Sequence, residues 1–188
     1  MIRQGLRMRL FIAINFSGEV KQKLVELQEG LRENSLGGNF STYENLHLTL
    51  VFLGEVAASR VGAVRKAMDN AAFSPFRLSI RGVGSFSRNG GDILWAGIDA
   101  GRSLTGLQSR LSSQIALAGF ELEKRNFKPH LTLAREVRLR ADFDRAAFSR
   151  GINTISTEVS KISLMKSERL GGKLTYTEIY SVSGTPAM

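Results

Sequence analysis

The sequence predicts an α+β fold in which two lobes are built on antiparallel sheets with flanking helices. The first observation is a repeated tetrapeptide, since residues 47–50 and residues 130–133 both read His-Leu-Thr-Leu. One copy in each half of the chain indicates two similar lobes. The second observation is the mixed order of helices and strands, with several strands following strands, which is typical of α+β proteins with antiparallel sheets.

The chain begins with a predicted strand and helix. Residues 9–15 form a short apolar run that predicts a buried strand. Ser17 is a helix-capping residue, and Glu19 falls in the first turn after it. Apolar residues then recur at helical spacing until Asn34, with Gly37 and Gly38 beyond it. These residues are Val20, Leu24, Leu27 and Leu31.

The first tetrapeptide predicts a strand that Val51 and Phe52 extend and Gly54 ends. Successive side chains of a strand point to opposite faces, so His47 and Thr49 share one face and the leucines pack on the other. The second tetrapeptide predicts the same arrangement for its histidine and threonine.

The remaining elements follow from the same two periodicities. Leucine and valine spacing predicts helices around residues 61–68 and 104–115, and a short helical piece is expected at 141–148. Alternating segments predict strands at 76–80, 92–98, 155–164 and 174–182. No long linker divides the chain, so we expect one bilobal domain over residues 1–188, with residues 1–7 as a flexible extension.

The composition restricts the class of function. Lys and Arg number 26 against 17 acidic residues, a net charge of +9 that favours a polyanionic partner such as nucleic acid. Cysteine is absent, which excludes disulfides and thiol chemistry and fits the cytoplasm. No apolar stretch is long enough to span a membrane.

The repeated motif contains both histidines of the chain. Histidine exchanges a proton near neutral pH, so two imidazoles in one cleft can act as general acid and general base. Thr49 and Thr132 can donate hydrogen bonds to an oxyanion, and this set suits a phosphate ester. A zinc site is a poor alternative, since two histidines on separate strands lack the third and fourth ligands that zinc requires.

These segments resemble the two-histidine (2H) phosphoesterase superfamily, and within it the RNA 2′,3′-cyclic phosphodiesterases, historically called 2′-5′ RNA ligases. The similarity covers most of the chain. The matching segments are residues 9–14, 44–55, 93–97, 127–135 and 167–176.

The resemblance implies a bilobal 2H phosphoesterase fold, with one motif per lobe facing a central cleft and no cofactor or metal. It implies hydrolysis of an RNA 2′,3′-cyclic phosphate to a 2′-phosphate. By this resemblance, His47 donates a proton to the departing 3′ oxygen and His130 accepts the proton of water, while Thr49 and Thr132 hold the phosphate oxygens. The residues alone leave the two histidine roles interchangeable. The expected partner is RNA with a cyclic phosphate end, such as a tRNA half. We expect the protein to be a monomer that does not bind a membrane.

Further residues are candidates for substrate binding. Arg135 matches a family arginine that reaches the phosphate, although strict alternation places it opposite His130. The others are Tyr176 and Phe40, which could stack on a base, and Lys128 and Arg125, which could guide the RNA backbone. Each also has a simpler interpretation as core packing or solvated charge.

Two other functions remain open at this point. The strained cyclic phosphate can drive ATP-independent 2′-5′ ligation, and the chain has no Walker-type loop. A non-catalytic RNA- or nucleotide-binding module on the same scaffold is the second alternative. All four motif residues are present, which favours catalysis.

Overall fold

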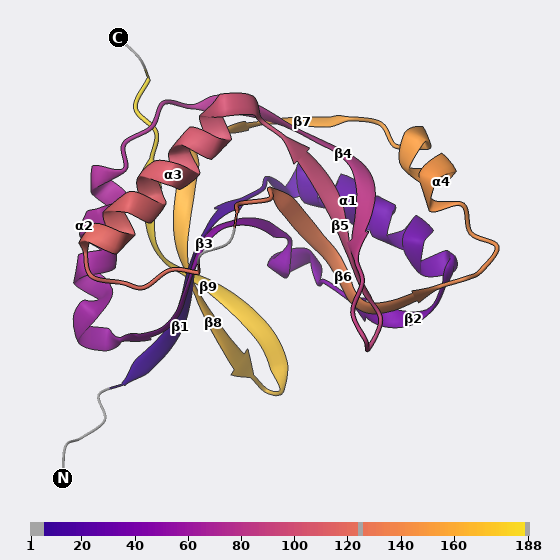
Figure 1. Ribbon diagram of the computed structural model, residues 1–188, viewed down its shortest axis with the longest axis horizontal. Helices are drawn as coiled ribbons and strands as arrows, with labels where there is room; N and C mark the ends of the chain where they lie inside the picture. Colours follow the sequence, from indigo (N-terminus) through magenta and orange to yellow (C-terminus); the bar gives the residue numbers. More distant parts are fainter. Residues whose placement is uncertain (1–5, 124–125, 187–188) are drawn as a thin grey trace.

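Two antiparallel sheets form the frame of the molecule (Figure 1), and the computed structural model describes residues 6–123 and 126–186. The first sheet has four strands in the order β3-β1-β8-β9: β3 (His47–Ala57), β1 (Arg7–Asn15), β8 (Lys161–Leu170) and β9 (Lys173–Ser183). The second has five in the order β2-β6-β5-β4-β7: β2 (Ser35–Phe40), β6 (His130–Leu139), β5 (Asp92–Asp99), β4 (Phe76–Phe86) and β7 (Ile155–Val159). The predicted α+β class is confirmed, and each sheet carries one motif strand.

Helices cover both sheets. Helix α1 (Gly18–Glu33) contacts β2, β6 and β7 of the five-stranded sheet, whereas α2 (Val61–Asn70) and α3 (Gly101–Leu117) pack together beside the four-stranded one (Figure 1). A short helix, α4 (Arg145–Gly151), contacts β4, and single 3₁₀ turns occur at Tyr43–Asn45 (η1) and Ala58–Arg60 (η2). No helix in the described part of the chain is long and apolar enough to cross a membrane.

Helix α1 follows its sequence signals closely. The Ser17 side chain accepts a hydrogen bond from the Val20 backbone N–H, and Asn34 forms the C-cap. The predicted apolar residues Leu24 and Leu31 are fully buried. A buried polar residue, Gln28, lies among them.

Several predicted boundaries are wrong for identifiable reasons. Gly54 does not end β3: its φ of 68° forms a bulge, and the strand continues to pair with β1 up to Ala57. The segment 155–164 is two strands in different sheets, separated at Ser160. The helix expected at 141–148 begins at Arg145, because Asp144 caps it by accepting from the Ala147 N–H at 2.9 Å.

The predicted flexible extension over residues 1–7 includes two residues, Leu6 and Arg7, that bond to the fold. Arg7 is the first residue of β1 and pairs with Ala57. The backbone carbonyl of Leu6 accepts a hydrogen bond from the Ala58 N–H at 2.8 Å. Residues 1–5 lie outside the described residues.

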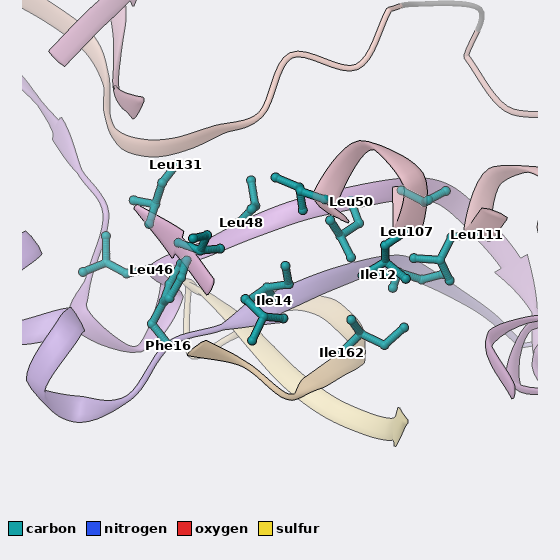
Figure 2. Close-up of a cluster of buried hydrophobic side chains, with 14 of the residues drawn as sticks. Ile12, Ile14, Phe16, Leu46, Leu48, Leu50, Leu107, Leu111, Leu131 and Ile162 are labelled. Atoms are coloured by element: carbon teal, nitrogen blue, oxygen red, sulfur yellow. The ribbon is translucent and has the colours of Figure 1, made fainter. Parts of the chain in front are cut away.

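One hydrophobic core connects the two sheets. Leu48 and Leu50 of β3 and Leu131 and Leu133 of β6 all belong to a single buried cluster. Figure 2 shows Leu131 directed toward the stretch of β3 that carries Leu48. The leucines of both tetrapeptides therefore pack inward together, and this packing sets the opposite faces of the two motif strands toward the cleft.

Candidate active site

The alternation predicted for the two motifs is present in the structure. His47 and Thr49 lie on the half-buried face of β3, while Leu48 between them is completely buried. His47 Nε2 lies 3.0 Å from Thr49 Oγ1. His130 and Thr132 have the same arrangement of burial on β6.

Both imidazoles are oriented by a backbone carbonyl two residues earlier. His47 Nδ1 lies 2.7 Å from the Asn45 carbonyl oxygen, and His130 Nδ1 lies 2.7 Å from that of Lys128. A carbonyl can only accept, so each Nδ1 carries the proton and donates it. Each Nε2 is therefore the nitrogen that can exchange a proton with a substrate.

Aromatic rings fix the two imidazoles from the side. Phe11 and Tyr176 lie 4.9 and 5.2 Å from His47 between ring centroids. Around His130 the equivalent rings belong to Phe86 and Trp95, at 5.1 and 6.4 Å. Such packing limits the rotation of each imidazole and preserves the direction of its Nε2.

Each motif strand has a β-bulge at the last residue of its tetrapeptide. In β6, Thr132 pairs with Trp95 but Ala134 pairs with the adjacent Leu94, so Leu133 is the extra residue. Leu133 and Ala134 are consequently buried in succession. From this point the alternation of side chains is shifted by one residue, so the Arg135 side chain lies on the same face of β6 as His130. The expectation from strict alternation, that Arg135 lies opposite His130, is thus wrong.

The same bulge occurs in β3. Thr49 pairs with Ala13 and Val51 pairs with Ile12, so Leu50 is the extra residue and both Leu50 and Val51 are buried. The side chain brought to the His47 face is that of Phe52, which is 42% exposed.

A glutamine from a helix binds the carbonyl at each bulge. Gln28 Nε2 of α1 donates to the Leu133 carbonyl at 2.6 Å and to the Ser41 carbonyl at 2.9 Å. Gln108 Nε2 of α3 donates to the Leu50 carbonyl at 3.5 Å. The bulge carbonyls thus have partners outside the strand ladder, which stabilises the irregular geometry.

The two motif strands border a shared cleft of about 800 Å³. Thr49 lines it from the first motif, and His130, Thr132 and Arg135 line it from the second. His47 is placed beside this cleft by its contact with Thr49. The structure therefore gathers the predicted motif residues of both lobes at one location.

Positive charge surrounds His47. Burial lowers the pKa of His47 below its ordinary value, and the cations Lys21 and Arg135 lower it further, against an opposing effect of the Asn45 carbonyl. Burial also raises the pKa of Tyr176, while Arg135 and Arg9 oppose that shift. Arg135 also lines the cleft, and its charge favours an anion between the two motifs.

The other predicted binding residues have different positions. Lys128 lines the cleft, and Tyr176 packs edge-on against His47. Phe40 is not brought to the cleft: its ring packs against the core, with the Arg32 guanidinium 4.6 Å from the ring centroid. Arg125 lies outside the described residues.

Sequence reasoning missed several residues of the site. The sequence pattern assigns Phe52 only to the strand, and the apolar spacing of α1 does not include Gln28. A polar residue on the apolar face of α1, between Leu27 and Leu31, was the available signal for Gln28. In the described parts of the chain, no group of three or more His, Asp or Glu side chains is placed to hold a metal ion.

Two sheets that each present a histidine and a threonine to one cleft define a two-histidine phosphoesterase. A sequence profile of the 2′-5′ RNA ligase superfamily matches residues 18–171, and the chain belongs to this family. The family resemblance that the two motifs indicate is thereby confirmed.

Relatives and solved structures agree with this assignment. An RNA 2′,3′-cyclic phosphodiesterase of Archaeoglobus fulgidus is 33% identical over 129 residues, covering 68% of this chain and 72% of the relative. The protein of that name from Escherichia coli is 28% identical, covering 91% and 93%. The crystal structure of E. coli LigT complexed with 3′-AMP superposes with a TM-score of 0.82 at 28% identity, covering 96% of this chain and 99% of LigT.

Proposed function

We propose that this protein hydrolyses the 2′,3′-cyclic phosphate at the end of an RNA to a 2′-phosphate. The observation that carries the proposal is the pair of imidazoles with the same hydrogen bonding. Each donates its Nδ1 proton to a carbonyl at 2.7 Å, which leaves both Nε2 atoms for acid and base catalysis. The E. coli and A. fulgidus relatives carry the name of this activity.

In the proposed reaction, water attacks phosphorus and the bond to the 3′ oxygen breaks. Neutral His130 accepts the proton of water at Nε2, and protonated His47 gives its Nε2 proton to the 3′ oxygen. The product has a 3′ hydroxyl and a 2′-phosphate. Thr49 and Thr132 donate hydrogen bonds to the non-bridging oxygens, and Arg135 contributes positive charge.

The lowered pKa of His47 supports the binding of an anionic substrate. Burial, and to a smaller extent Lys21 and Arg135, lower the pKa of His47 and disfavour its imidazolium in the free protein. A bound phosphate compensates these cations, so His47 holds its proton more tightly in the complex. Substrate binding thus prepares the general acid that the reaction requires.

We further propose that the reaction needs no metal ion, and we propose a substrate, an oligomeric state and a cellular location. The net charge of +9 supports a polyanionic substrate, and we propose tRNA halves with cyclic phosphate ends, acted on by a monomer in the cytoplasm. Light scattering of the purified protein tests the monomer, and the sequencing of RNA ends that accumulate without the protein tests the substrate.

The decisive experiment incubates a short RNA ending in a 2′,3′-cyclic phosphate with the protein in EDTA and resolves the 2′- and 3′-phosphate products. We expect a 2′-phosphate, with His47→Ala and His130→Ala each lowering kcat at least 100-fold. An RNA with a 3′-phosphate is the substrate control and should remain unchanged. Saturable binding without turnover would instead indicate a binding module.

A further inference from the structure

Asn45 bonds to its surroundings through both its main chain and its side chain. Its carbonyl oxygen accepts the Nδ1 proton of His47 at 2.7 Å, and its side-chain Nδ2 donates to the Leu174 carbonyl of β9 at 2.8 Å. Strands β1 and β8 separate β3 from β9 in the sheet, so the Asn45 side chain makes a contact that strand pairing does not supply. The residue that orients His47 is therefore tied to the last strand of the chain.

The segment that carries Asn45 is the short 3₁₀ turn η1, which is also held from its other side. The Asn45 backbone N–H donates to the Thr42 carbonyl at 3.0 Å, and Lys21 Nζ of α1 donates to the Glu44 carbonyl at 3.1 Å. Hydrogen bonds within a 3₁₀ turn have poor geometry, so a single turn is not rigid by itself. The position of the Asn45 carbonyl thus depends on the contacts of η1 with α1 and β9.

Strand β9 also contacts the imidazole of the first motif directly. The Tyr176 ring packs edge-on against His47, with 5.2 Å between the ring centroids. Leu174, which accepts the hydrogen bond of Asn45, lies two residues before Tyr176 in the same strand. The Asn45 side chain therefore fixes the carbonyl that orients the imidazole relative to the ring that packs against it.

The second motif orients its histidine through a different kind of residue. The carbonyl that accepts from His130 belongs to Lys128, whose side chain lines the cleft. The side chain at this position thus borders the substrate in the second motif, whereas in the first motif the Asn45 amide bonds to β9. The two imidazoles have the same hydrogen bond, but the carbonyls that accept it are supported differently.

We propose that Asn45 is a positioning residue for the general acid. Its side chain bonds to the Leu174 carbonyl and so holds the Asn45 carbonyl where it fixes the Nδ1 proton of His47 and the direction of Nε2. This inference rests on the proposed function, which makes His47 the proton donor. Burial lowers the pKa of His47, and the Asn45 carbonyl opposes this shift by favouring the imidazolium that the general acid requires.

Asn45→Ala tests the role, because it removes the side-chain donor and leaves the main-chain carbonyl. On the cyclic phosphate RNA we expect kcat to fall about 10-fold to 100-fold with KM near that of the wild type, since an oriented proton donor acts in the transition state. Asn45→Gln retains an amide donor and should recover part of kcat. Arg65→Ala is the matched control: it removes a side-chain hydrogen bond to the Ile179 carbonyl of the same strand, from an exposed position of α2, and should change neither constant.

The tautomer of the His47 ring separates positioning from a general loss of structure. At a pH where the imidazole is neutral, ¹⁵N NMR of the wild type should place the proton on Nδ1. In Asn45→Ala part of the population should carry it on Nε2, while His130 keeps its tautomer. The chain has two histidines, so His130→Ala assigns the ring signals.

An unchanged kcat in Asn45→Ala, or a lower kcat with the His47 tautomer unchanged, would overturn the proposal. Equal changes at His47 and His130 would also overturn it, because they would indicate a general loss of structure. If the wild type does not turn over the RNA, it is the proposed function that fails. The tautomers then decide alone: a redistribution confined to His47 supports the link to β9, and unchanged populations contradict it.

Discussion

Phe52 and Arg135 occupy equivalent positions in the two motif strands. Each is the fifth residue after its motif histidine, each follows a bulge, and the first six residues of both strands share the same order of burial. The lobes thus place an apolar ring and a cation at corresponding points of one cleft. The repeated site is therefore asymmetric at this point, with an apolar ring on one side and a cation on the other.

Arg135→Ala is expected to lower kcat/KM about 10-fold to 100-fold, because a hydrogen bond to a charged group contributes roughly 1.5–3 kcal/mol. Steady-state kinetics on the cyclic phosphate RNA measures the change. Arg138→Ala removes the same charge from an exposed position on the same strand, outside the cleft, and is the control. Equal losses in both variants would indicate only a general effect of charge.

His47 should titrate below the ordinary histidine pKa of about 6.5 in the free protein, since burial and two cations disfavour its charged form. Inorganic phosphate should raise that pKa, and Arg135→Ala should raise it without phosphate. Proton NMR of the imidazole ring over a pH series follows both shifts. A His47 pKa that does not respond to phosphate would contradict an anion site beside this ring.

The same shift makes the stability of the protein depend on pH. The unfolded chain binds the His47 proton more readily than the folded one, so the His47 contribution is fully present above about pH 6.5. It is lost as the pH falls from there through the lower folded pKa. In urea unfolding between pH 5 and 8, His47→Gln should remove this part of the pH dependence of the free energy of unfolding. The same dependence on pH in the variant and the wild type would refute the prediction.

Gln28→Leu should lower the free energy of unfolding by about 1–3 kcal/mol, because it removes the side-chain donor shared by the Leu133 and Ser41 carbonyls. The Leu133 carbonyl then keeps the Ser41 N–H, at 2.9 Å. It should also lower activity, since the bulge that directs Arg135 loses support. Gln22→Leu, at an exposed position of the same helix, is the control for stability. In the Gln28→Leu background, Arg135→Ala should lower activity less than it does in the wild type. Additive losses of activity would mean that Gln28 does not act through Arg135.

Gly84→Ala tests how Trp95 supports His130. A methyl group at Gly84 would overlap the Trp95 ring, which must then move, at a cost of about 1–3 kcal/mol. We expect lower kcat and a shifted emission spectrum from Trp95, the only tryptophan. Gly90→Ala in the same hairpin meets nothing within 4 Å and should change neither. Full activity in Gly84→Ala would remove Trp95 from the positioning of His130.

Strong local signals predicted much of the fold. Ser17 and the leucine spacing located α1, and the apolar alternation located the motif strands. Strand β2 was missed because its sequence, Ser-Leu-Gly-Gly-Asn-Phe, has no alternation and forms a strand through its pairing with β6. The change of sheet at Ser160 was equally invisible, because an alternating pattern gives the face of a residue but not its partner strand.

The centre of the site was predictable because its chemistry is concentrated in two identical tetrapeptides. The residues around it depend on tertiary contacts. Arg135 and Phe52 reach the cleft only through bulges, which shift the alternation by one residue and have no signature in the sequence. Phe40 was expected near a base, but an aromatic side chain at a strand end fits the core equally well, and there it packs under Arg32.

The strand order of the four-stranded sheet has a consequence for synthesis of the protein. Strand β1 lies between β3 and β8, and Tyr176 of β9 packs against His47, so the first motif is completed by the last strands to be made. A nascent chain that already contains both tetrapeptides still has one edge of β1 unpaired. We therefore expect the surroundings of His47 to reach their final packing only once β8 and β9 have left the ribosome.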